Sequence, residues 1–369
     1  MTLNIGIDAR LTHYRSAGTS AYIRALLHAF ASTPVSDETY TVIQSRKQAE
    51  RLAPSLRHIK AWTPSHHKLE KWALSAELTR LRLDVLHSPD FIPPIRGARK
   101  HVISVLDLGF LHYPDILTDE SRRYYNDQIE WAVKHADHIL AISESTKHDL
   151  VTLLNVPPEK VTVHLLAAHE RFKPLPIDVV QPVLKKFGLT AGYLLFVSTI
   201  EPRKNIEGLL DAYAVLRRKQ PDVPPLVLVG RVGWLVEETM ALIHETPNVL
   251  HITNASDDDL PALYNGASAL ILPSFYEGFG LSPLEAMACG TLPIVSDRAS
   301  LPEVVGGIGL RVNPYEQEDM IQAMRTAIAR DNSAWLAKQR IAALERAATF
   351  TWARTAHIAR EVYRQVVAQ

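Results

Sequence analysis

The stretch 269–297 reads ALILPSFYEGFGLSPLEAMACGTLPIVSD, and two short apolar runs, ALILPS (269–274) and LPIVSD (292–297), enclose a helical pattern. Continuous apolar runs of this length, separated by a helix, are typical of parallel strands that are covered on both faces. A loop with Gly278 and Gly280 follows the first run, and the helix is expected to begin near Pro283. The stretch therefore predicts one strand–loop–helix–strand unit.

The same alternation extends along the whole chain. Further apolar runs are NIGID (4–8), YTVI (40–43), VLHS (85–88), HVISVLD (101–107), HILAIS (138–143), YLLFVS (193–198) and PLVLVG (225–230). Ten or so such units are more than one doubly wound sheet commonly carries. We therefore expect an α/β protein with two doubly wound domains. Ligands of such sheets bind beyond the carboxyl ends of the strands, so a cleft between the two domains is the expected site.

The segment 171–182, RFKPLPIDVVQP, has three prolines and no helical period, and we interpret it as a linker. It places the first domain at residues 1–174 and the second at 183–350. The chain has 369 residues, of which 47% are apolar and 22% charged, as in ordinary globular proteins.

Composition also sets limits on the partners and the cellular compartment. The formal net charge of zero gives no indication of nucleic-acid binding. No apolar run is long enough to span a membrane, and the N-terminus lacks the pattern of a signal peptide. Cys289 is the single cysteine, which fits a reducing compartment. We expect a cytoplasmic protein.

The loop between residues 274 and 282 has the properties of a phosphate-binding loop. Glycines let the backbone approach a ligand, and the first turn of the next helix offers free N–H groups and a positive dipole end. The spacing differs from the P-loop and from the dinucleotide fingerprint. Ser282-Pro283-Leu284-Glu285 also matches a capping box, which the spacing alone favours over ligand binding by Glu285. Glu277 is either a solvated loop acid or a ligand-binding group.

Two other loops carry candidate residues. The string STIEPRKN (198–205) follows the run YLLFV, and its Arg203 and Lys204 could stabilise the charge of a leaving diphosphate. In isolation, an exposed basic turn is the favoured interpretation. Near the N-terminus, Gly18 precedes a helical pattern that Thr19 or Ser20 could cap.

The spacing E-x(7)-E formed by Glu277 and Glu285 within YEGFGLSPLEAMACG resembles the signature of the family-4 retaining glycosyltransferases. The following PIVSDRASLPEVVGGIGLRVNP (293–314) is also similar to their C-terminal domain, and the similarity covers nearly the whole chain. The resemblance implies the GT-B fold, with two Rossmann-like domains facing a central cleft. It also implies that residues 351–369 form a last helix, capped by Thr351, that packs on the first domain.

The activity implied by the resemblance is the transfer of a sugar from a nucleotide diphosphate (GDP, dTDP or UDP) to a glycan or lipid-linked acceptor in surface polysaccharide synthesis. Configuration at the sugar carbon is retained, and no metal or other cofactor is needed. Lys204 and Arg203 would bind the diphosphate, Glu277 would lie by the donor sugar, and Glu285 would bind the ribose hydroxyls. Other donor contacts would come from Gly18, Ser198, Gly278, Phe279, Gly280, Leu281 and Ser282.

The segment HVISVLDLGFLHYPD (101–115) resembles a family segment in which a histidine precedes the aspartate and lies against the donor sugar. Asp107 is kept as a candidate catalytic residue, but Leu106 occupies the histidine position. A leucine there favours a 6-deoxy sugar, because it cannot pair a 6-hydroxyl and would contact a methyl group. If His112 or Asp107 supplies the contact instead, an ordinary hexose such as mannose or glucose is expected.

Two charged segments lie outside this candidate site. We interpret Asp257–Asp259 as the acidic start of a helix rather than a metal site. The segment 44–82 holds nine Lys/Arg and three acids, with Trp62 and Trp72 interleaved. It is either a solvated helical surface or a face that meets anionic lipid at the inner membrane or a phosphate-linked acceptor.

Two other functions fit the same scaffold. A sugar-nucleotide epimerase could have this fold, because fold alone does not determine function. A sugar-nucleotide-binding protein without turnover is the non-enzymatic alternative, because the chain departs from the family pattern at three places. Gly18 stands alone where the family usually has two or more glycines, Ser198-Thr199 stands where it often has Gly-Arg, and Leu106 replaces the histidine.

Overall fold

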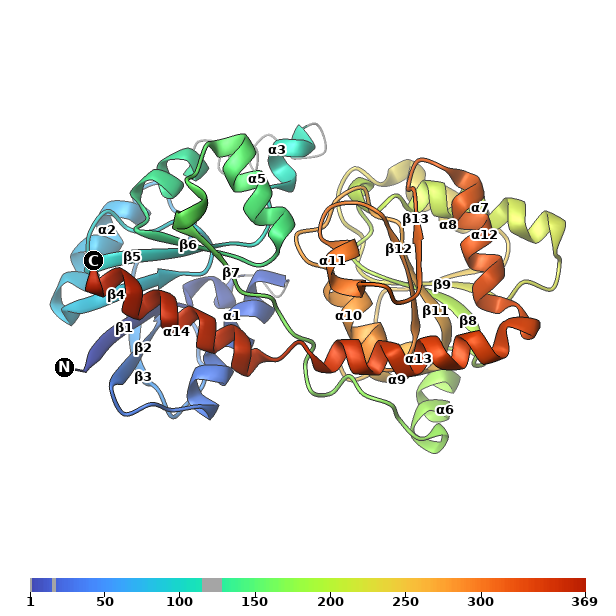
Figure 1. Cartoon of the computed structure of the whole chain (residues 1–369), viewed down its shortest axis with the longest axis horizontal. Helices are drawn as coiled ribbons and strands as arrows, with labels where there is room; N and C mark the ends of the chain where they lie inside the picture. The colour runs from blue at the N-terminus through green and yellow to red at the C-terminus, as the bar shows by residue number, and fades with distance from the viewer. Residues whose placement is uncertain (1, 15–17, 115–127) are drawn as a thin grey trace. The chain divides into compact units, whose positions relative to one another are not determined.

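The computed structural model describes residues 2–14, 18–114 and 128–369, and the chain divides into two compact units (Figure 1). The N-terminal unit comprises residues 1–166 together with 351–369, and the C-terminal unit comprises residues 167–350. Each unit contains one parallel sheet with helices on both faces. The predicted α/β class with two Rossmann-like domains is confirmed.

The sheet of the N-terminal unit has the order β3-β2-β1-β4-β5-β6-β7, and its described strand pairs are all parallel. Its strands are β1 (Leu3–Asp8), β2 (Glu38–Ser45), β3 (Arg57–Ala61), β4 (Leu83–Ser88), β5 (Ala98–Val105), β6 (His138–Ala141) and β7 (Val161–Val163). The strand order reverses between β1 and β4. Such a topological switch point is where ligands of open α/β sheets bind.

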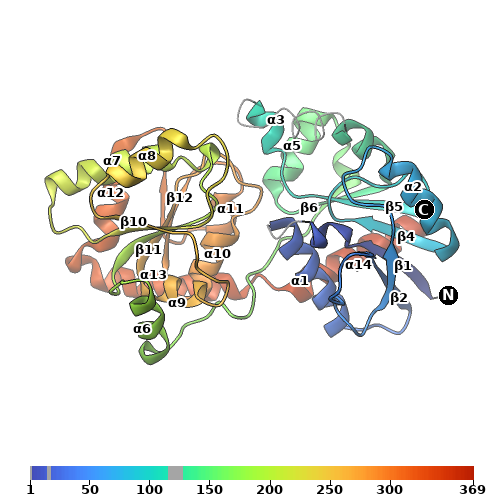
Figure 2. The ribbon, with the colours of Figure 1, turned by 180° about the vertical axis from the view of Figure 1, so that it is seen from behind.

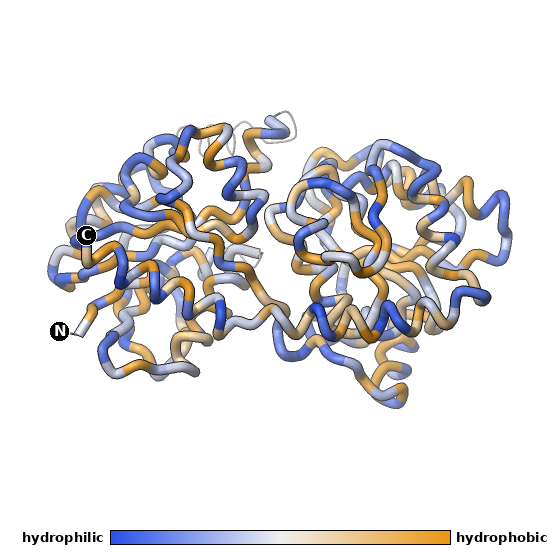
Figure 3. Tube along the Cα trace, viewed as in Figure 1, coloured by the Kyte–Doolittle hydropathy of each residue, from blue (hydrophilic) through white to orange (hydrophobic). Residues whose placement is uncertain are grey.

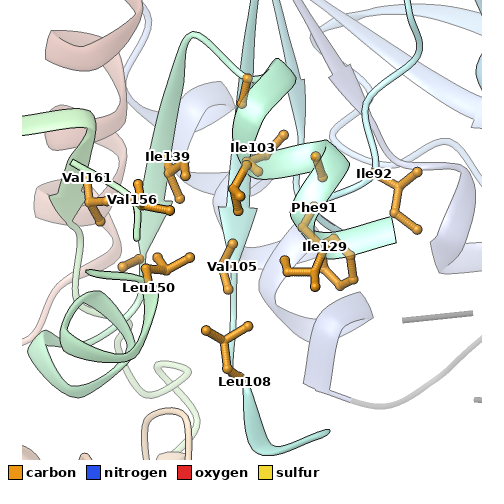
Figure 4. Close-up of a cluster of buried hydrophobic side chains, with 14 of the residues drawn as sticks. Phe91, Ile92, Ile103, Val105, Leu108, Ile129, Ile139, Leu150, Val156 and Val161 are labelled. Carbon is orange, nitrogen blue, oxygen red and sulfur yellow. The ribbon is translucent and has the colours of Figure 1, made fainter. Parts of the chain in front are cut away.

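Two layers of helices cover this sheet (Figures 1 and 2). Helices α1 (Gly18–Ser32) and α14 (Trp352–Ala368) lie on one face, and α2 (Glu70–Leu78) and α5 (Glu144–Leu154) lie on the other. The short elements are α3 (Gly109–His112), η1 (Arg10–His13), η2 (Thr79–Leu81) and η4 (Pro158–Lys160). Figure 4 shows part of the core, in which Phe91, Ile103 and Leu150 belong to one buried apolar cluster.

The last helix, α14, packs on the N-terminal unit against α1, β4 and β5. Thr351 caps it by accepting a hydrogen bond from the Arg354 N–H at 3.2 Å, as the sequence predicts. The buried Tyr363 hydroxyl lies 2.7 Å from His87 Nδ1. Specific polar contacts therefore fix the position of α14 on this unit.

The sheet of the C-terminal unit has the order β10-β9-β8-β11-β12-β13, and its described pairs are parallel. Its strands are β8 (Tyr193–Val197), β9 (Leu226–Val229), β10 (Val249–Ile252), β11 (Ala267–Leu272), β12 (Leu292–Ser296) and β13 (Leu310–Val312). The apolar runs that begin at residues 193, 225, 269 and 292 all form strands. The switch point of this sheet lies between β8 and β11.

Helices again cover both faces of the sheet (Figures 1 and 2). One group comprises α7 (Ile206–Lys219), α8 (Glu237–Glu245) and α12 (Gln317–Ile328); the other comprises α6 (Ile177–Lys186), α9 (Leu260–Gly266), α10 (Leu281–Ala288), α11 (Leu301–Val305) and α13 (Ser333–Ala348). The 3-10 helices are η5 (Pro202–Lys204) and η6 (Arg330–Asn332). Figure 3 shows hydrophobic segments along the central strands and alternating hydropathy along the outer helices.

The predicted linker at 171–182 needs correction. Helix α6 begins at Ile177 and contains Pro182, and Val180 and Leu184 on α6 are buried in the core of the C-terminal unit. Phe172 belongs to the same core. The units divide at residues 166 and 167. Val180 and Leu184 have the i, i+4 spacing of one helix face, and their burial in the core stabilises a helix here. This burial stabilises α6 more than the internal Pro182 weakens it.

No helix among the described residues has both the length and the apolar character required to cross a membrane.

Candidate functional site

The loops that follow β8 and β11 meet at the switch point of the C-terminal sheet. The backbone N–H of Phe275 donates to the carbonyl of Arg203 at 2.9 Å, which joins the two loops. Four charged side chains gather there, Glu201, Arg203, Lys204 and Glu277, and we call them the charge cluster. The fold thus brings together three of the four predicted catalytic residues.

Each cation of the charge cluster contacts both carboxylates. Lys204 Nζ donates to Glu277 Oε1 at 2.7 Å and lies 3.7 Å from Glu201 Oε1. Arg203 Nη2 donates to Glu201 Oε1 at 2.9 Å, and its Nη1 lies 3.7 Å from Glu277 Oε2. Two cations and two anions give the cluster no net charge. An anionic ligand of these cations would therefore compete with two carboxylates.

Burial makes these pairs energetically significant. Lys204 is 6% exposed and Glu277 is 8% exposed, so neither is a solvated surface group. Burial alone would raise the pKa of Glu277, but the charges of Lys204 and Arg203 and the Ser274 hydroxyl outweigh it, and the pKa lies below its ordinary value. The exposed-turn interpretation of Lys204 and the solvated-acid interpretation of Glu277 are both wrong.

The loop before α10 presents backbone donors. The N–H groups of Phe279, Gly280 and Leu281 make no hydrogen bond within the described part of the chain. Ser300 Oγ lies 2.8 and 2.6 Å from the carbonyls of Glu277 and Phe279 and holds the loop in place. Gly280 has a φ of 112°, and a Cβ there would lie 2.8 Å from a Leu301 methyl group. The geometry therefore fits an anion-binding loop.

The capping box predicted for Ser282 and Glu285 does not form. Helix α10 begins at Leu281, because Gly280 takes the positive φ that starts the helix two residues earlier than the pattern implies. The Ser282 hydroxyl donates to the Val197 carbonyl at 2.8 Å, and Glu285 accepts from the Tyr264 hydroxyl at 2.9 Å. Ligand binding by Glu285 stays a prediction.

Glu285 is partly buried beside Tyr264 on α9. Its burial raises the pKa to about 7, although the hydrogen bond from Tyr264 opposes this rise. The protonated form of Glu285 is therefore favoured more than for an ordinary carboxyl group. Any ligand that needs the carboxylate form binds in competition with a proton.

Three groups that support the site were not assigned from the sequence. Glu201 pairs with both cations, and Ser274 donates to Glu277 Oε1 at 2.7 Å. Gly230 lets its backbone lie close to that of Ser198, because a Cβ at residue 230 would be 1.8 Å from the Ser198 carbonyl oxygen. A glycine directly after the run PLVLV is the one local signal that could have indicated such an approach. The backbone N–H of Ser198 donates a hydrogen bond to the Val229 carbonyl at 3.1 Å.

Two predicted residues belong to the N-terminal unit. Asp107 Oδ1 accepts the Gly109 N–H at 3.0 Å and so stabilises the start of α3. Gly18 is the first residue of α1, which places Thr19 and Ser20 inside the helix rather than at its cap. The rest of that glycine loop, residues 15–17, lies outside the described residues. Leu106 is half-buried at the end of β5.

The acids at 257–259 precede α9 instead of lying in its first turn. Asp259 accepts hydrogen bonds from the Ser256 N–H at 2.8 Å and from Lys186 Nζ at 2.7 Å. Among the described residues, no group of three or more His, Cys, Asp and Glu side chains is arranged to hold a metal ion.

Comparison with known proteins gives a consistent assignment. Residues 17–164 match the model of Glycosyltransferase Family 4, and residues 185–342 match Glycosyl transferases group 1. The chain is 33% identical over 298 residues to O-antigen chain mannosyltransferase B of Escherichia coli, covering 80% of this chain and 76% of that protein. It is 32% identical over 253 residues to the serotype-specific mannosyltransferase WbdA of Escherichia coli, covering 67% of this chain and 31% of WbdA.

The fold is similar to that of the sucrose-phosphate synthase from Thermosynechococcus elongatus, with a TM-score of 0.79 and 20% sequence identity over 99% of both chains. The spacing of Glu277 and Glu285, the two Rossmann-like sheets and these matches agree with one another. The chain belongs to the family-4 glycosyltransferases, of the GT-B fold.

Proposed function

We propose that this glycosyltransferase moves a mannose from a nucleotide diphosphate onto a glycan or lipid-linked acceptor in surface polysaccharide synthesis, with retention of configuration. The observation that carries the proposal is the charge cluster beside the N–H groups of Phe279, Gly280 and Leu281. The similarity to two mannosyltransferases, one of them an O-antigen chain enzyme, supports mannose as the sugar.

In the proposed reaction, the diphosphate lies against these N–H groups and shares Lys204 and Arg203 with the two carboxylates. As the bond between the sugar carbon and the phosphate oxygen breaks, negative charge grows on the departing diphosphate. Preformed donors and cations stabilise such charge without reorganisation. The acceptor oxygen bonds to the sugar carbon on the same face, and its proton goes to the departing phosphate. Glu277 keeps Lys204 in position.

The proposal is tested by incubating the chain with GDP-mannose, GDP-linked 6-deoxyhexoses, dTDP-rhamnose and UDP-glucose, with and without mannose-terminated oligosaccharides. We expect transfer from GDP-mannose only when acceptor is present, an α-linked product by NMR, and an undiminished rate in EDTA. Preference for a 6-deoxy donor would favour the Leu106 interpretation instead.

The same assay separates the alternative functions. Conversion of the sugar without acceptor would indicate an epimerase, and binding without turnover would indicate a binding protein. A rate that chelation stops and Mg²⁺ restores would contradict the metal-free mechanism.

The Glu285→Gln variant tests whether this carboxylate binds the nucleotide. Because the pKa of Glu285 is about 7, GDP affinity of the wild type is expected to rise between pH 6 and pH 8, as the carboxylate forms. The variant should bind GDP about tenfold more weakly at pH 8 and lose this pH dependence, because a charge-assisted hydrogen bond is replaced by a neutral one. Calorimetric titration of GDP at several pH values measures both effects.

The stability of the variant serves as the control. A carboxyl group whose pKa is raised by folding stabilises the folded state at low pH, and that stability is lost as pH rises through the raised value. Glu285→Gln should therefore melt at the same temperature as the wild type or higher at pH 8. A clearly lower melting temperature with unchanged GDP affinity would mean that Glu285 is structural.

We further propose that the segment 44–82 contacts anionic membrane. Two of its three acids are turned inward, because Glu70 pairs with Arg10 and Glu77 accepts the N–H groups of Trp62 and Thr63. The large apolar side chains Trp62, Leu69 and Trp72 are more than 60% exposed. Exposed tryptophans beside basic residues are typical of membrane-surface contacts.

Sedimentation with vesicles of phosphatidylglycerol and phosphatidylcholine tests this contact. We expect binding at low salt, loss of binding at high salt, and at least a fivefold reduction in the Trp62→Ser/Trp72→Ser variant. Trp234→Ser changes an exposed tryptophan of the C-terminal unit and should have no effect. Equal sedimentation of the double variant and the wild type would remove the argument.

A further inference from the structure

A narrow pocket lies at the switch point of the N-terminal sheet, where β1 and β4 end. Its polar lining is formed by Asp8, Ser65, His66, Glu70, Ser88 and Asp90. The free volume is about 10 Å³, which is the space of a single water or hydroxyl group. The pocket is lined only by residues of the N-terminal unit, and no residue of the charge cluster is among them.

Most polar groups of this pocket are already paired. The buried Arg10 guanidinium donates to Asp8 Oδ2 at 2.6 Å and also binds Glu70. Glu70 Oε2 accepts the His66 N–H at 2.8 Å, and the His66 imidazole contacts Asp90 Oδ2. These contacts give the pocket a fixed wall.

Two polar atoms of the wall, on Ser88 and Asp90, are not paired in this way. Ser88 is 2% exposed, and its hydroxyl has no hydrogen-bond partner among the described residues. Asp90 Oδ1 likewise makes no hydrogen bond to the described part of the chain, since the Asp90 side chain contacts His66 through Oδ2. Buried hydroxyl groups without a partner are rare, because each costs free energy that a bound group would recover. Ser88 and Asp90 both line this pocket, so its wall carries one donor and one acceptor that the described residues leave unpaired.

The backbone beside these atoms is held in an uncommon conformation. His66 has a φ of 62° and Phe91 a φ of 34°, the left-handed region that residues other than glycine seldom adopt. The Phe91 ring is anchored in the apolar cluster below the loop (Figure 4). The core therefore fixes the loop that carries Ser88 and Asp90.

Charge and size restrict the ligand. Three carboxylates, on Asp8, Glu70 and Asp90, line the pocket, whereas the one guanidinium, on Arg10, pairs with Asp8 and Glu70 from behind the lining. Acidic groups therefore outnumber basic groups around the pocket, whether or not His66 is counted. A phosphate group, which is itself negative, would be repelled by this charge. A hydroxyl can donate to Asp90 Oδ1 and accept from Ser88 Oγ.

We propose that this pocket binds a hydroxyl group of an uncharged acceptor sugar, with Ser88 and Asp90 as specificity-determining residues. The proposal rests on the proposed function for the choice of a sugar as ligand. It predicts that the acceptor terminus is a neutral sugar and that a sugar with a phosphate at this position is rejected.

Saturation-transfer NMR with methyl α-D-mannopyranoside and with mannose 6-phosphate tests the proposal on the full chain. We expect the neutral sugar to bind at least tenfold more tightly. Ser88→Ala should weaken it about fivefold, the effect of one lost hydrogen bond. Asp90→Asn should weaken binding of methyl α-D-mannopyranoside and reduce its preference over mannose 6-phosphate. Ser55→Ala, at an exposed serine of the same unit, should change nothing.

The melting temperature distinguishes recognition from a structural role. The Ser88 hydroxyl has no partner in the protein, so Ser88→Ala should melt at the wild-type temperature or higher. Unchanged sugar affinity in Ser88→Ala, or equal affinity of the wild type for the two sugars, would overturn the proposal. Titration of GDP separates the two hypotheses: failure of the chain to bind GDP contradicts the proposed function, whereas normal GDP binding without sugar binding contradicts this inference alone.

Discussion

Replacing Lys204 by alanine is expected to lower kcat for transfer by about 10²–10³, the usual cost of removing one group that stabilises transition-state charge. Lys204 is the cation that is buried next to the anion-binding loop, and Arg203 keeps its own hydrogen bonds to Glu201 and the Tyr276 carbonyl. Arg203 is therefore poorly placed to compensate. Single-turnover transfer from GDP-mannose measures the effect, and a rate within threefold of the wild type would rule out the assigned role.

Because Lys204 is buried, the same variant is also expected to lose stability. Glu277 would keep Arg203 at 3.7 Å as its nearest charged partner, and breaking a buried ion pair from one side costs about 3 kcal/mol. The double variant Lys204→Ala/Glu277→Gln removes the unpaired charge and should recover most of that stability. Its transfer should stay as low as that of the single variant. Lys185→Ala, at an exposed lysine of α6, controls for charge and should match the wild type in both measurements.

The fold could be predicted from the sequence because its signals are local. The runs 193–198 and 269–274 carry their strand character in a few consecutive apolar residues, and any parallel sheet built from them needs helices between them. The motif around Glu277 likewise occupies one short segment. Position on the carboxyl side of a strand indicated the loop at 274–282, whereas the loop at 198–205 was favoured as a binding loop only through the resemblance to the family-4 glycosyltransferases.

The contacts inside the site could not be predicted, because they join residues far apart in the chain. Lys204 and Glu277 are 73 residues apart, and only the neighbouring positions of β8 and β11 make them a buried pair. The capping box failed for a related reason. Ser282 and Glu285 have the right spacing, but Val197 and Tyr264 offer them partners from other elements. Tertiary contacts here outweigh local propensity.

The pocket of the N-terminal unit shows the same limitation. Ser88 ends β4 and Asp90 lies two residues later, but nothing in that segment indicates that a hydroxyl would be buried without a partner. Other parts of the wall come from Asp8, at the end of β1, and from His66, on another loop. A sequence pattern reports which residues follow a strand, whereas an unsatisfied group becomes visible only in three dimensions.

Replacing Glu277 by alanine is expected to lower the free energy of unfolding by about 3–5 kcal/mol, because the buried Lys204 would keep Glu201, at 3.7 Å, as its one anionic partner among the described residues. Glu277→Gln keeps an oxygen that can accept from Lys204 or Ser274, so it should lose clearly less stability. It should still lower kcat by about 10², because Lys204 would no longer be held in one position. GDP affinity should change little in the glutamine variant, since the backbone donors of the loop remain.

The pH dependence of stability provides a second readout of Glu277. Its pKa is lower in the folded chain than the ordinary value of 4.5, so the ionised form stabilises the folded state above pH 4.5, and this stability is lost as pH falls through the lowered pKa. Chemical denaturation of Glu277→Gln between pH 7 and pH 3 should therefore show a shallower loss of stability than the wild type. Glu345→Ala, at an exposed glutamate of α13, should follow the wild-type curve. Identical acid profiles of Glu277→Gln and the wild type would mean that the Lys204–Glu277 pair contributes no stability.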